Sequence, residues 1–249
     1  MNASEAEPVT PLAPRPLEHT LFRQFWRDVV FLHWEVCPFE VAALLPPGAA
    51  PDLYQGRAYV GLVFFRMENL ALGAGPRLPH AGTFNEVNVR LYSRDTSGRR
   101  GVVFRSLDCD RLASVVAARG AFGLAYQWSR VSHRWFGDDR RLLYRSRRRS
   151  RSPARSHVWL DVVPEVHTRA SQLESFLTNR WGLHERVLGR TYYLPNTHPQ
   201  WSFLRCSLLG WDASVVGDSG LGPPAGEPVS VLYSPGLPVR FGLPSRLSA

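Results

Sequence analysis

The sequence predicts an α+β fold in which antiparallel strands dominate and a few helices lie at the periphery. About ten segments carry the alternation or the β-branched and aromatic enrichment of strands, and about three carry the pattern of helices. These segments lack the regular strand–helix order of a doubly wound sheet. Gly and Pro contribute 20 residues each to a chain of 249, which indicates many turns. We therefore predict a mostly antiparallel β-barrel domain at residues 19–249, after a disordered, proline-rich leader at residues 1–18.

The first half of the chain holds the most apolar strand candidates. The strands predicted there are residues 28–36, 58–67, 83–93 and 101–107. Turn residues at 95–98 separate the last two, so we expect these two strands to pair as a hairpin. A short helix is predicted at 38–45, because Pro38 suits a first helical turn and Pro46-Pro47 ends the helix.

The second half contains two further helix candidates and the remaining strands. Residues 110–122 are predicted to form one helix, with Asp110 as its N-cap. Ser171 begins the other helix, and Glu174 completes a capping box with it. The predicted strands are residues 125–135, 140–149, 157–163, 186–194 and 203–211, followed by one or two short strands within 228–241.

The composition excludes one kind of chemistry and indicates an anionic partner. All 30 residues counted as Lys+Arg are arginines, since the sequence contains no lysine. A lysine Schiff base is therefore excluded, as is any other mechanism that needs a lysine amine. The net charge of +9 attracts nucleic acid, acidic lipid or anionic ligands, and eight of the arginines lie within residues 140–155.

The arginine run at 140–155 has three interpretations. It is the solvated face of a strand and a basic loop, a phosphate-binding surface for nucleic acid, or a surface that pairs with acidic residues of another subunit. Few aromatic residues interleave with the run itself, which argues against base stacking. We favour the solvated face, so nucleic acid is the less favoured partner.

Neither a membrane nor a metal is indicated by the sequence. The N-terminus lacks the basic and apolar regions of a signal peptide, and no apolar run reaches the roughly 18 residues of a membrane span. Three cysteines and eight scattered histidines fit neither a disulfide scaffold nor a zinc site. We expect a cytoplasmic protein without metal or cofactor, and a second copy of the chain is one partner that the sequence allows.

The strand at 83–93 carries the most informative polar pattern. Glu86, Asn88 and Arg90 alternate with apolar residues, so they share one face of the strand. An exposed face with a cross-strand ion pair is one interpretation and the one that the pattern alone favours. The other is that the face lines the inside of a closed sheet, where these groups would point at a ligand.

Two residues of the first predicted strand region are further candidates. Arg27 precedes a buried strand, where a guanidinium is suited to bidentate binding of a carboxylate. His33 lies within an apolar run, and a lone histidine in that position is more often a hydrogen-bonded core residue than a ligand.

Several segments together resemble a known family. They are WRDVVFLHWEV, LLPPG, GRAYVGLVFFRM, FNEVNVRLYSR, GVVFRSLDCDRLASVVAAR, YRSRRR, LESFLTNRWGL and VLYSPGLPV, within a match that runs from about Trp26 to Arg246. On these segments the chain resembles the bacterial YqjF-like family of unknown function, in the acetoacetate decarboxylase-like superfamily. The resemblance implies a cone-shaped, mostly antiparallel β-barrel with outer helices and a ligand cavity, and it places the arginine run on a strand.

The resemblance also implies site residues. The resemblance implies an arginine at the start of the first strand and a glutamate that follows an aromatic residue and an Asn or His on a later strand, and Arg27 and Glu86 occupy the matching places. In the family, the catalytic lysine follows the strand that matches residues 101–107, where this sequence has Asp108, Cys109, Asp110 and Arg111. An arginine does not replace that lysine, because a guanidinium keeps its proton in proteins.

We therefore expect a protein that binds a small organic acid or carbonyl compound in its cavity and is not a Schiff-base decarboxylase. Arg27 would clamp the anion, and Glu86 would act as general base or hydrogen-bond acceptor. The ligand would be oriented by His33, Asn85, Asn88 and Arg90. The alternatives are a non-catalytic regulatory module that uses the same cavity and, less favoured, nucleic-acid binding through the arginine run.

Overall fold

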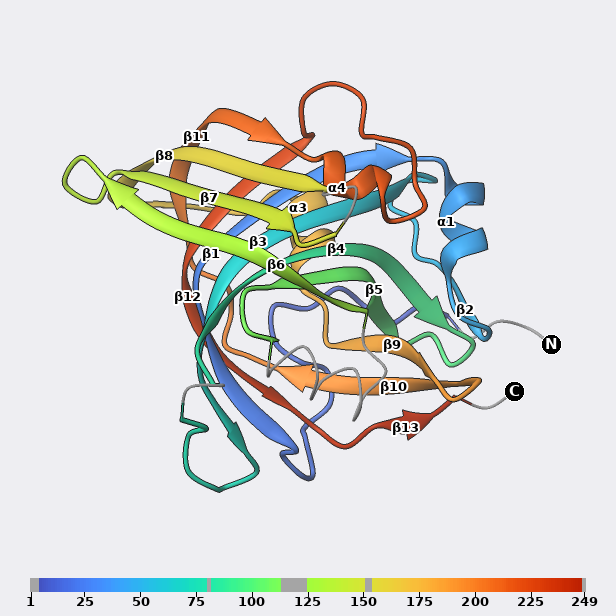
Figure 1. Ribbon diagram of the computed structural model, residues 1–249. Helices are drawn as coiled ribbons and strands as arrows, with labels where there is room; N and C mark the ends of the chain where they lie inside the picture. The colour runs from blue at the N-terminus through green and yellow to red at the C-terminus, as the bar shows by residue number, and fades with distance from the viewer. Residues whose placement is uncertain (1–4, 80–81, 113–124, 151–153, 248–249) are drawn as a thin grey trace.

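The computed structural model describes residues 5–79, 82–112, 125–150 and 154–247 (Figure 1). The strands are β1 (Phe22–Val36), β2 (Ala49–Pro51), β3 (Ala58–Leu72), β4 (Phe84–Asp95), β5 (Arg100–Cys109), β6 (Tyr126–Phe136), β7 (Arg141–Arg148), β8 (Arg155–Thr168), β9 (Gly182–Val187), β10 (Arg190–Thr197), β11 (Phe203–Asp212), β12 (Ser230–Phe241) and β13 (Ser245–Arg246). The helices in these ranges are α1 (Pro38–Leu44), α3 (Gln172–Thr178) and α4 (Ser214–Gly217). A fold of mostly strands with few helices is thus confirmed. Within the same ranges, no helix has the length and apolar character needed to cross a membrane.

Most predicted elements correspond to observed ones, and the differences have local causes. The single strand predicted at 186–194 is wrong, because Leu188 and Gly189 have φ of 48° and 79° and turn the chain into the β9–β10 hairpin. Glycine adopts this left-handed conformation without a steric cost. The capping box at Ser171 is confirmed, and the helix that it begins, α3, ends at Thr178. The helix predicted at 110–122 lies mostly outside the described residues.

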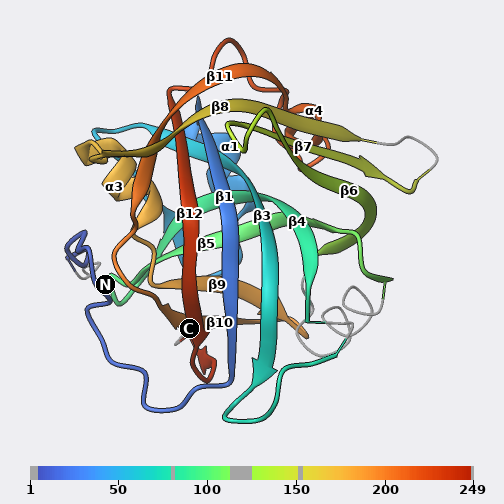
Figure 2. The ribbon, with the colours of Figure 1, turned by 90° about the vertical axis from the view of Figure 1, so that its left-hand side faces the viewer.

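The strand pairings close on themselves in two ways. One circuit runs through nine strands, in the order β12, β1, β3, β4, β5, β6, β7, β8, β11 and back to β12. A second circuit uses the same β12, β1, β3, β4 and β5 but returns through β9 and β10. The pairings are antiparallel except β5–β6 and β5–β9. Figure 2 shows β12, β1 and β3 side by side in the part that both circuits share.

Two apolar cores lie on opposite faces of these shared strands. The β9–β10 core includes Phe31, Phe65, Phe176, Leu183 and Trp201. The β6–β8 core includes Leu32, Phe64, Leu142, Val158 and Leu160. Successive residues of a strand point to opposite faces, so β4 sends Phe84 and Tyr92 into the first core and Val87 and Val89 into the second.

A β-bulge in β1 sets which of its side chains enter the β9–β10 core. The pairing with β3 shifts between Arg27 and Val30, and Asp28 has a φ of 51°. Tyr233 Oη donates to the Asp28 carboxylate at 2.8 Å, which holds the bulge in place. Trp26 packs on Phe65 with ring centroids 5.0 Å apart, so Trp26 takes the inward position before the bulge.

The leader packs against the body over its described part. Residues 5–18 form neither helix nor strand, in keeping with their prolines. The Glu7 backbone N–H nevertheless donates to the Gly98 carbonyl at 2.9 Å, and Arg15 donates to Tyr193 Oη at 3.1 Å. These contacts attach the segment that the sequence predicts to be disordered. The division of the chain at residue 19 stays a prediction.

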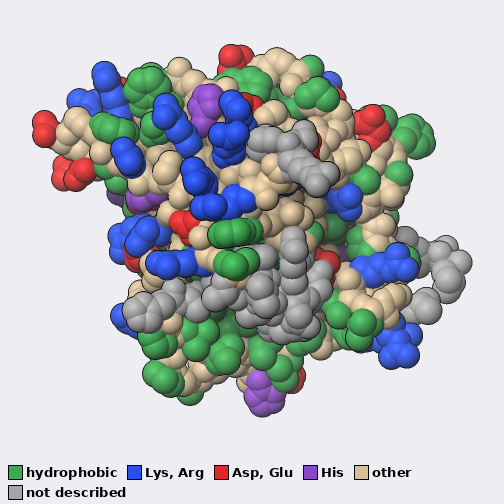
Figure 3. All heavy atoms as spheres, in the orientation of Figure 1, with side chains coloured by type: hydrophobic (Ala, Val, Ile, Leu, Met, Phe, Trp, Pro, Cys, Tyr) green, Lys and Arg blue, Asp and Glu red, His purple; other side chains and the backbone are tan. Residues whose placement is uncertain are grey.

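Arginine side chains gather on the outer face of β6, β7 and β8. Figure 3 shows them as blue atoms in its upper left part, over the strands at the front of Figure 1. β6 and β7 pair as an antiparallel hairpin, and β7 carries Arg141, Arg145, Arg147 and Arg148, so this part of the arginine run lies on a strand, as the resemblance implied.

Candidate ligand-binding site

The polar residues of β4 line the interior of the molecule. Glu86 is 2% exposed, Asn88 3% and Arg90 6%. They share the face of β4 that carries Phe84 and Tyr92, which belong to the β9–β10 core. The exposed-face interpretation of this strand is therefore wrong, because its second face is buried as well.

Space for the Arg90 side chain is left by a glycine on the neighbouring strand. Arg90 is paired with Gly61 of β3, and Gly61 is paired with His33 of β1. A Cβ on Gly61 would lie 2.7 Å from Tyr92 Oη and 3.2 Å from Arg90 Cγ. Only glycine therefore lets the two side chains lie across β3 at this point.

The Arg90 guanidinium lies between aromatic rings without a charged partner. Its Cζ lies 5.2 Å from the centre of the Phe31 ring and 5.7 Å from that of Tyr92. Within the described part of the chain, Nε and Nη2 of Arg90 have no hydrogen-bond acceptor and no carboxylate pairs with Arg90. A buried cation in this state is costly unless an anion or water accepts from it.

A second buried guanidinium belongs to Arg180, which follows α3. Arg180 Nη1 donates to the Asp52 carboxylate, and Arg100 Nη1 donates to the same carboxylate at 2.5 Å. One carboxylate thus faces two guanidinium groups. In the described ranges, Nε and Nη2 of Arg180 have no acceptor. Arg90 and Arg180 together give this part of the β9–β10 core an excess of positive charge.

A small cavity of about 30 Å³ lies between these groups. Its polar lining consists of Arg90, Thr178, Arg180, Asn196 and His198. Trp26 also lines it, and neither Trp26 Nε1 nor Asn196 Oδ1 has a hydrogen-bond partner among the described residues. Unpaired buried polar groups that surround one space indicate water or a ligand.

His33 is a neutral group beside the two cations. It is fully buried, and its Nδ1 lies 3.3 Å from Ser230 Oγ. Burial first, and then the charges of Arg90 and Arg180, hold the pKa of His33 well below its ordinary value. The imidazole is therefore neutral, and its Nε2 has no hydrogen-bond partner in the described part of the structure.

Glu86 forms the other end of the polar row on β4. Tyr126 Oη donates to its Oε2 at 2.7 Å, and Asn88 Nδ2 donates to its Oε1 at 3.3 Å. Burial raises the pKa of the Glu86 carboxyl to about 7. Cys109 is its partner on β5, and burial raises the pKa of that thiol as well. Glu86 is thus able to give or take a proton near neutral pH, whereas Cys109 stays protonated.

The structure does not bring Arg27 and Glu86 together, contrary to the expectation from the sequence. Arg27 Nε donates to Glu68 at 3.0 Å, and half of the Arg27 side chain (50%) is exposed. Because Trp26 takes the inward position, Arg27 faces away from the β9–β10 core. Asn85 also faces away, since it precedes Glu86, and it donates to Asp110 at 2.9 Å. Of the predicted residues, only His33, Glu86, Asn88 and Arg90 share the interior face.

Sequence reasoning missed the residues that complete the site. These are Asp52, Tyr126, Arg180 and Asn196. They come from loops and strands far apart in the chain, and no local pattern marks them. The single available signal was Arg180, which lies within the LESFLTNRWGL segment, two residues after the last residue of α3.

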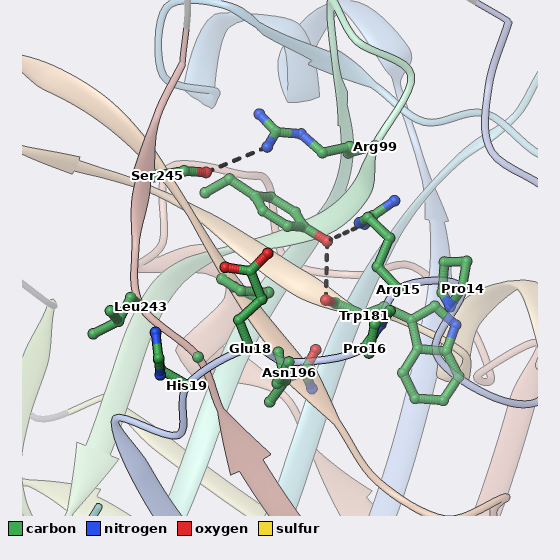
Figure 4. Close-up of a pocket in the computed structure, with 14 residues that line it drawn as sticks. Pro14, Arg15, Pro16, Glu18, His19, Arg99, Trp181, Asn196, Leu243 and Ser245 are labelled. Atoms are coloured by element: carbon green, nitrogen blue, oxygen red, sulfur yellow. Dashed lines mark hydrogen bonds between the residues drawn. The ribbon is translucent and has the colours of Figure 1, made fainter.

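A larger pocket of about 260 Å³ opens on the surface next to the cavity (Figure 4). It lies between the leader and β10, where Arg15 donates to Tyr193 Oη and Glu18 lines the wall. Asn196 lines both this pocket and the interior cavity. Among the described residues, no group of three His, Cys, Asp or Glu side chains has the arrangement of a metal site.

Comparisons with other proteins agree with this fold. An acetoacetate decarboxylase of Legionella pneumophila is 17% identical with a TM-score of 0.60, and 100% of this chain and 98% of that chain are covered. An acetoacetate decarboxylase-like enzyme of Sphingomonas wittichii RW1 is 15% identical with a TM-score of 0.60, covering 99% and 100%. The enduracididine biosynthesis enzyme MppR, complexed with pyruvate, is 14% identical with a TM-score of 0.58, covering 91% and 90%. Identities this low show the fold alone.

The sequence comparisons define the family. Uncharacterized protein YqjF of Bacillus subtilis (strain 168) is 31% identical over 182 residues, which are 73% of this chain and 74% of that protein. The model of DUF2071, described as an uncharacterized conserved protein, matches residues 23–238. The chain therefore belongs to the DUF2071 family, with an acetoacetate decarboxylase-like fold.

Proposed function

We propose that the protein binds a small organic acid inside its strand circuits, with the ligand carboxylate on Arg90 and Arg180. The observation that carries this proposal is the buried Arg90 guanidinium, which has no carboxylate partner among the described residues. Arginine binds carboxylates through paired N–H donors, and such pairs strengthen in a low-dielectric interior. In this proposal the shared strands form the wall of a cone-shaped barrel around the ligand.

The free space requires the site to open on binding. A cavity of about 30 Å³ holds water but not a three-carbon acid. The surface pocket shares Asn196 with the cavity, so we propose that a ligand enters from that pocket. The cost of moving the lining side chains is offset by neutralisation of the buried cations.

The polar row of β4 supports a second part of the proposal, an acid–base role for Glu86. A carboxyl with a pKa of about 7 suits proton transfer near neutral pH. His33 and Asn88 would then hold a carbonyl or hydroxyl group of the ligand between Arg90 and Glu86. MppR, which shares the fold, has been solved with pyruvate, and this makes a 2-oxo acid a suitable first candidate. The alternative is a binding module with the same site and no turnover.

Calorimetric titration with pyruvate, acetoacetate and acetate tests the proposal, with the methyl esters as uncharged controls. We expect the acids to bind and the esters not to bind. Arg90→Met should lower the affinity at least tenfold, and the matched control Arg186→Met, at an exposed position of β9, should change it less than twofold. Equal loss in both variants, or equal binding of acids and esters, would contradict the proposal. Analysis of the ligand after long incubation separates turnover from binding.

A further inference from the structure

The outer face of β6, β7 and β8 is strongly basic, and its acidic residues lie at its margins: Asp161 pairs with Arg140, and Asp212 lies on the neighbouring strand β11. Six exposed arginines define this basic face: Arg130, Arg134, Arg141, Arg145, Arg147 and Arg155. In the described part of the chain, none of the six takes part in an ion pair. A groove of about 510 Å³ runs along it.

The register places like charges directly opposite one another. Arg130 is paired with Arg147, and Arg147 is paired with Arg155, so three guanidinium groups form a row across three strands. Neighbouring strands are about 4.8 Å apart, and like charges at directly opposed positions destabilise a sheet. The next row brings Arg145 beside His157. A bound polyanion would relieve this repulsion.

Exposed aromatic rings lie on the same face. Trp128 is 39% exposed, Phe136 45% and Trp159 41%. Trp159 is uncovered because its partner on β11 is Gly210, which carries no side chain. Arg149 lies over the Trp128 ring at 4.4 Å. The arginine run has few aromatic residues along its own sequence, but the neighbouring strands supply them.

From this arrangement we infer that the basic face binds single-stranded nucleic acid, with phosphates on the arginine rows and bases stacked on the tryptophans. A sheet face with exposed aromatic rings and arginines suits unpaired bases, which stack with little dependence on sequence. The face of a sheet does not enter a duplex groove as a helix or a two-stranded ribbon does.

The spacing of the apolar side chains on the basic face favours single-stranded nucleic acid over a membrane as the partner. Trp128 lies six residues before Arg134 on β6, a distance of roughly 20 Å. Arg134 is in the same cross-strand row as Leu143 of β7 and Trp159 of β8. Two rows containing arginines lie between Trp128 and this row. The apolar side chains thus form no continuous band that could enter a bilayer, whereas a strand of several nucleotides spans the distance.

Fluorescence anisotropy with labelled 12-residue oligo(U) and oligo(dT) tests this inference, with salt varied from 50 to 200 mM. The triple variant Arg130→Ser, Arg147→Ser, Arg155→Ser should lose at least tenfold in affinity, and the slope of log K against log salt should fall by about 2. The matched control is Arg186→Ser, Arg190→Ser, Arg240→Ser, which removes the same charge from exposed positions elsewhere. Its affinity should stay within twofold or threefold of the unmodified protein.

A second set of variants separates stacking from charge. Trp128→Ala with Trp159→Ala keeps every charge and should lower the affinity about fivefold or more. An equal loss of affinity in both triple arginine variants would mean that binding depends on net charge alone and would overturn the inference. The inference also fails if oligonucleotides do not bind at 50 mM salt, if duplex binds as tightly as single strands, or if only vesicles of anionic lipid bind.

Discussion

His33 and Arg90 lie in one cross-strand row, with only Gly61 between them. The glycine has no side chain, so the imidazole of β1 and the guanidinium of β4 lie on the same buried face of the sheet with no side chain of β3 between them. This relationship couples the neutral state of His33 to the charge of Arg90. It also makes Gly61 the backbone position on which the proposed site depends most.

Gly61→Ala should disturb the site and the core together. The new Cβ would lie 2.7 Å from Tyr92 Oη, so Tyr92 and Arg90 must shift. We expect a loss of about 1–3 kcal/mol in the free energy of unfolding, typical of overpacking, and a weaker affinity for carboxylates. Urea denaturation and calorimetry measure the two effects. Gly210→Ala is the control, because a Cβ there meets nothing within 4 Å; an equal loss in both variants would show that Gly61 has no special role.

Glu86→Gln should remove part of the pH dependence of stability. The folded carboxyl keeps its proton up to about pH 7, whereas the unfolded chain releases it near its ordinary pKa of 4.5. The unfolded state therefore binds fewer protons in this interval, and this group makes the protein less stable as the pH rises through it. Between pH 4 and pH 8, the free energy of unfolding of the unmodified protein should fall by about 3 kcal/mol relative to that of Glu86→Gln. Urea unfolding across that range measures the difference.

The exposed variant Glu40→Gln serves as the control for this pH series. Its stability should run parallel to that of the unmodified protein. Glu86→Gln should also alter ligand turnover if Glu86 transfers a proton. A Glu86→Gln curve that runs parallel to the unmodified one would mean that the carboxyl does not keep its proton in the fold.

Asp52→Asn should destabilise the protein strongly. Asp52 is 3% exposed and accepts from both Arg100 and Arg180, so its loss leaves two largely buried cations without their counter-charge. Removal of one partner of a buried pair typically costs about 3–5 kcal/mol. Glu35→Gln breaks the exposed pair with Arg57 instead and should change the stability far less, because solvent screens exposed charges. Thermal and urea unfolding compare the two, and a small effect at Asp52 would show that the pair is solvated.

The three cysteines should differ in their rates of alkylation. Cys37 is exposed, whereas Cys109 is fully buried and burial raises the pKa of its thiol. Burial also raises the pKa of Cys206, to about 11. At pH 8 we expect iodoacetamide to modify Cys37 first, as mass spectrometry of short reactions would detect. Rapid modification of Cys109 in the folded protein would show that solvent reaches the Glu86 region freely.

The sequence predicts individual strands better than it predicts their surroundings. The alternation of residues 83–93 identifies β4 and separates Glu86, Asn88 and Arg90 from Val87 and Val89, because side chains of a strand alternate strictly. It does not tell which face is exposed, since both faces of β4 are buried by strands far away in the chain.

The Arg27 expectation failed for a related reason. The inward or outward direction of Arg27 depends on Trp26 and on the bulge at Asp28, and a bulge leaves no clear mark in a single sequence. Asp52 and Arg180 meet only because separate loops are folded together, so neither local spacing nor periodicity could have paired them.

The double circuit of pairings divides the shared strands into two interleaved sets of positions. In β4 one set, with Glu86, Asn88 and Arg90, faces the β9–β10 core, and the other set faces the β6–β8 core. Selection for a new ligand can therefore act on every second residue while the intervening residues keep the framework intact. A family built in this way is free to diversify its chemistry without rebuilding its scaffold.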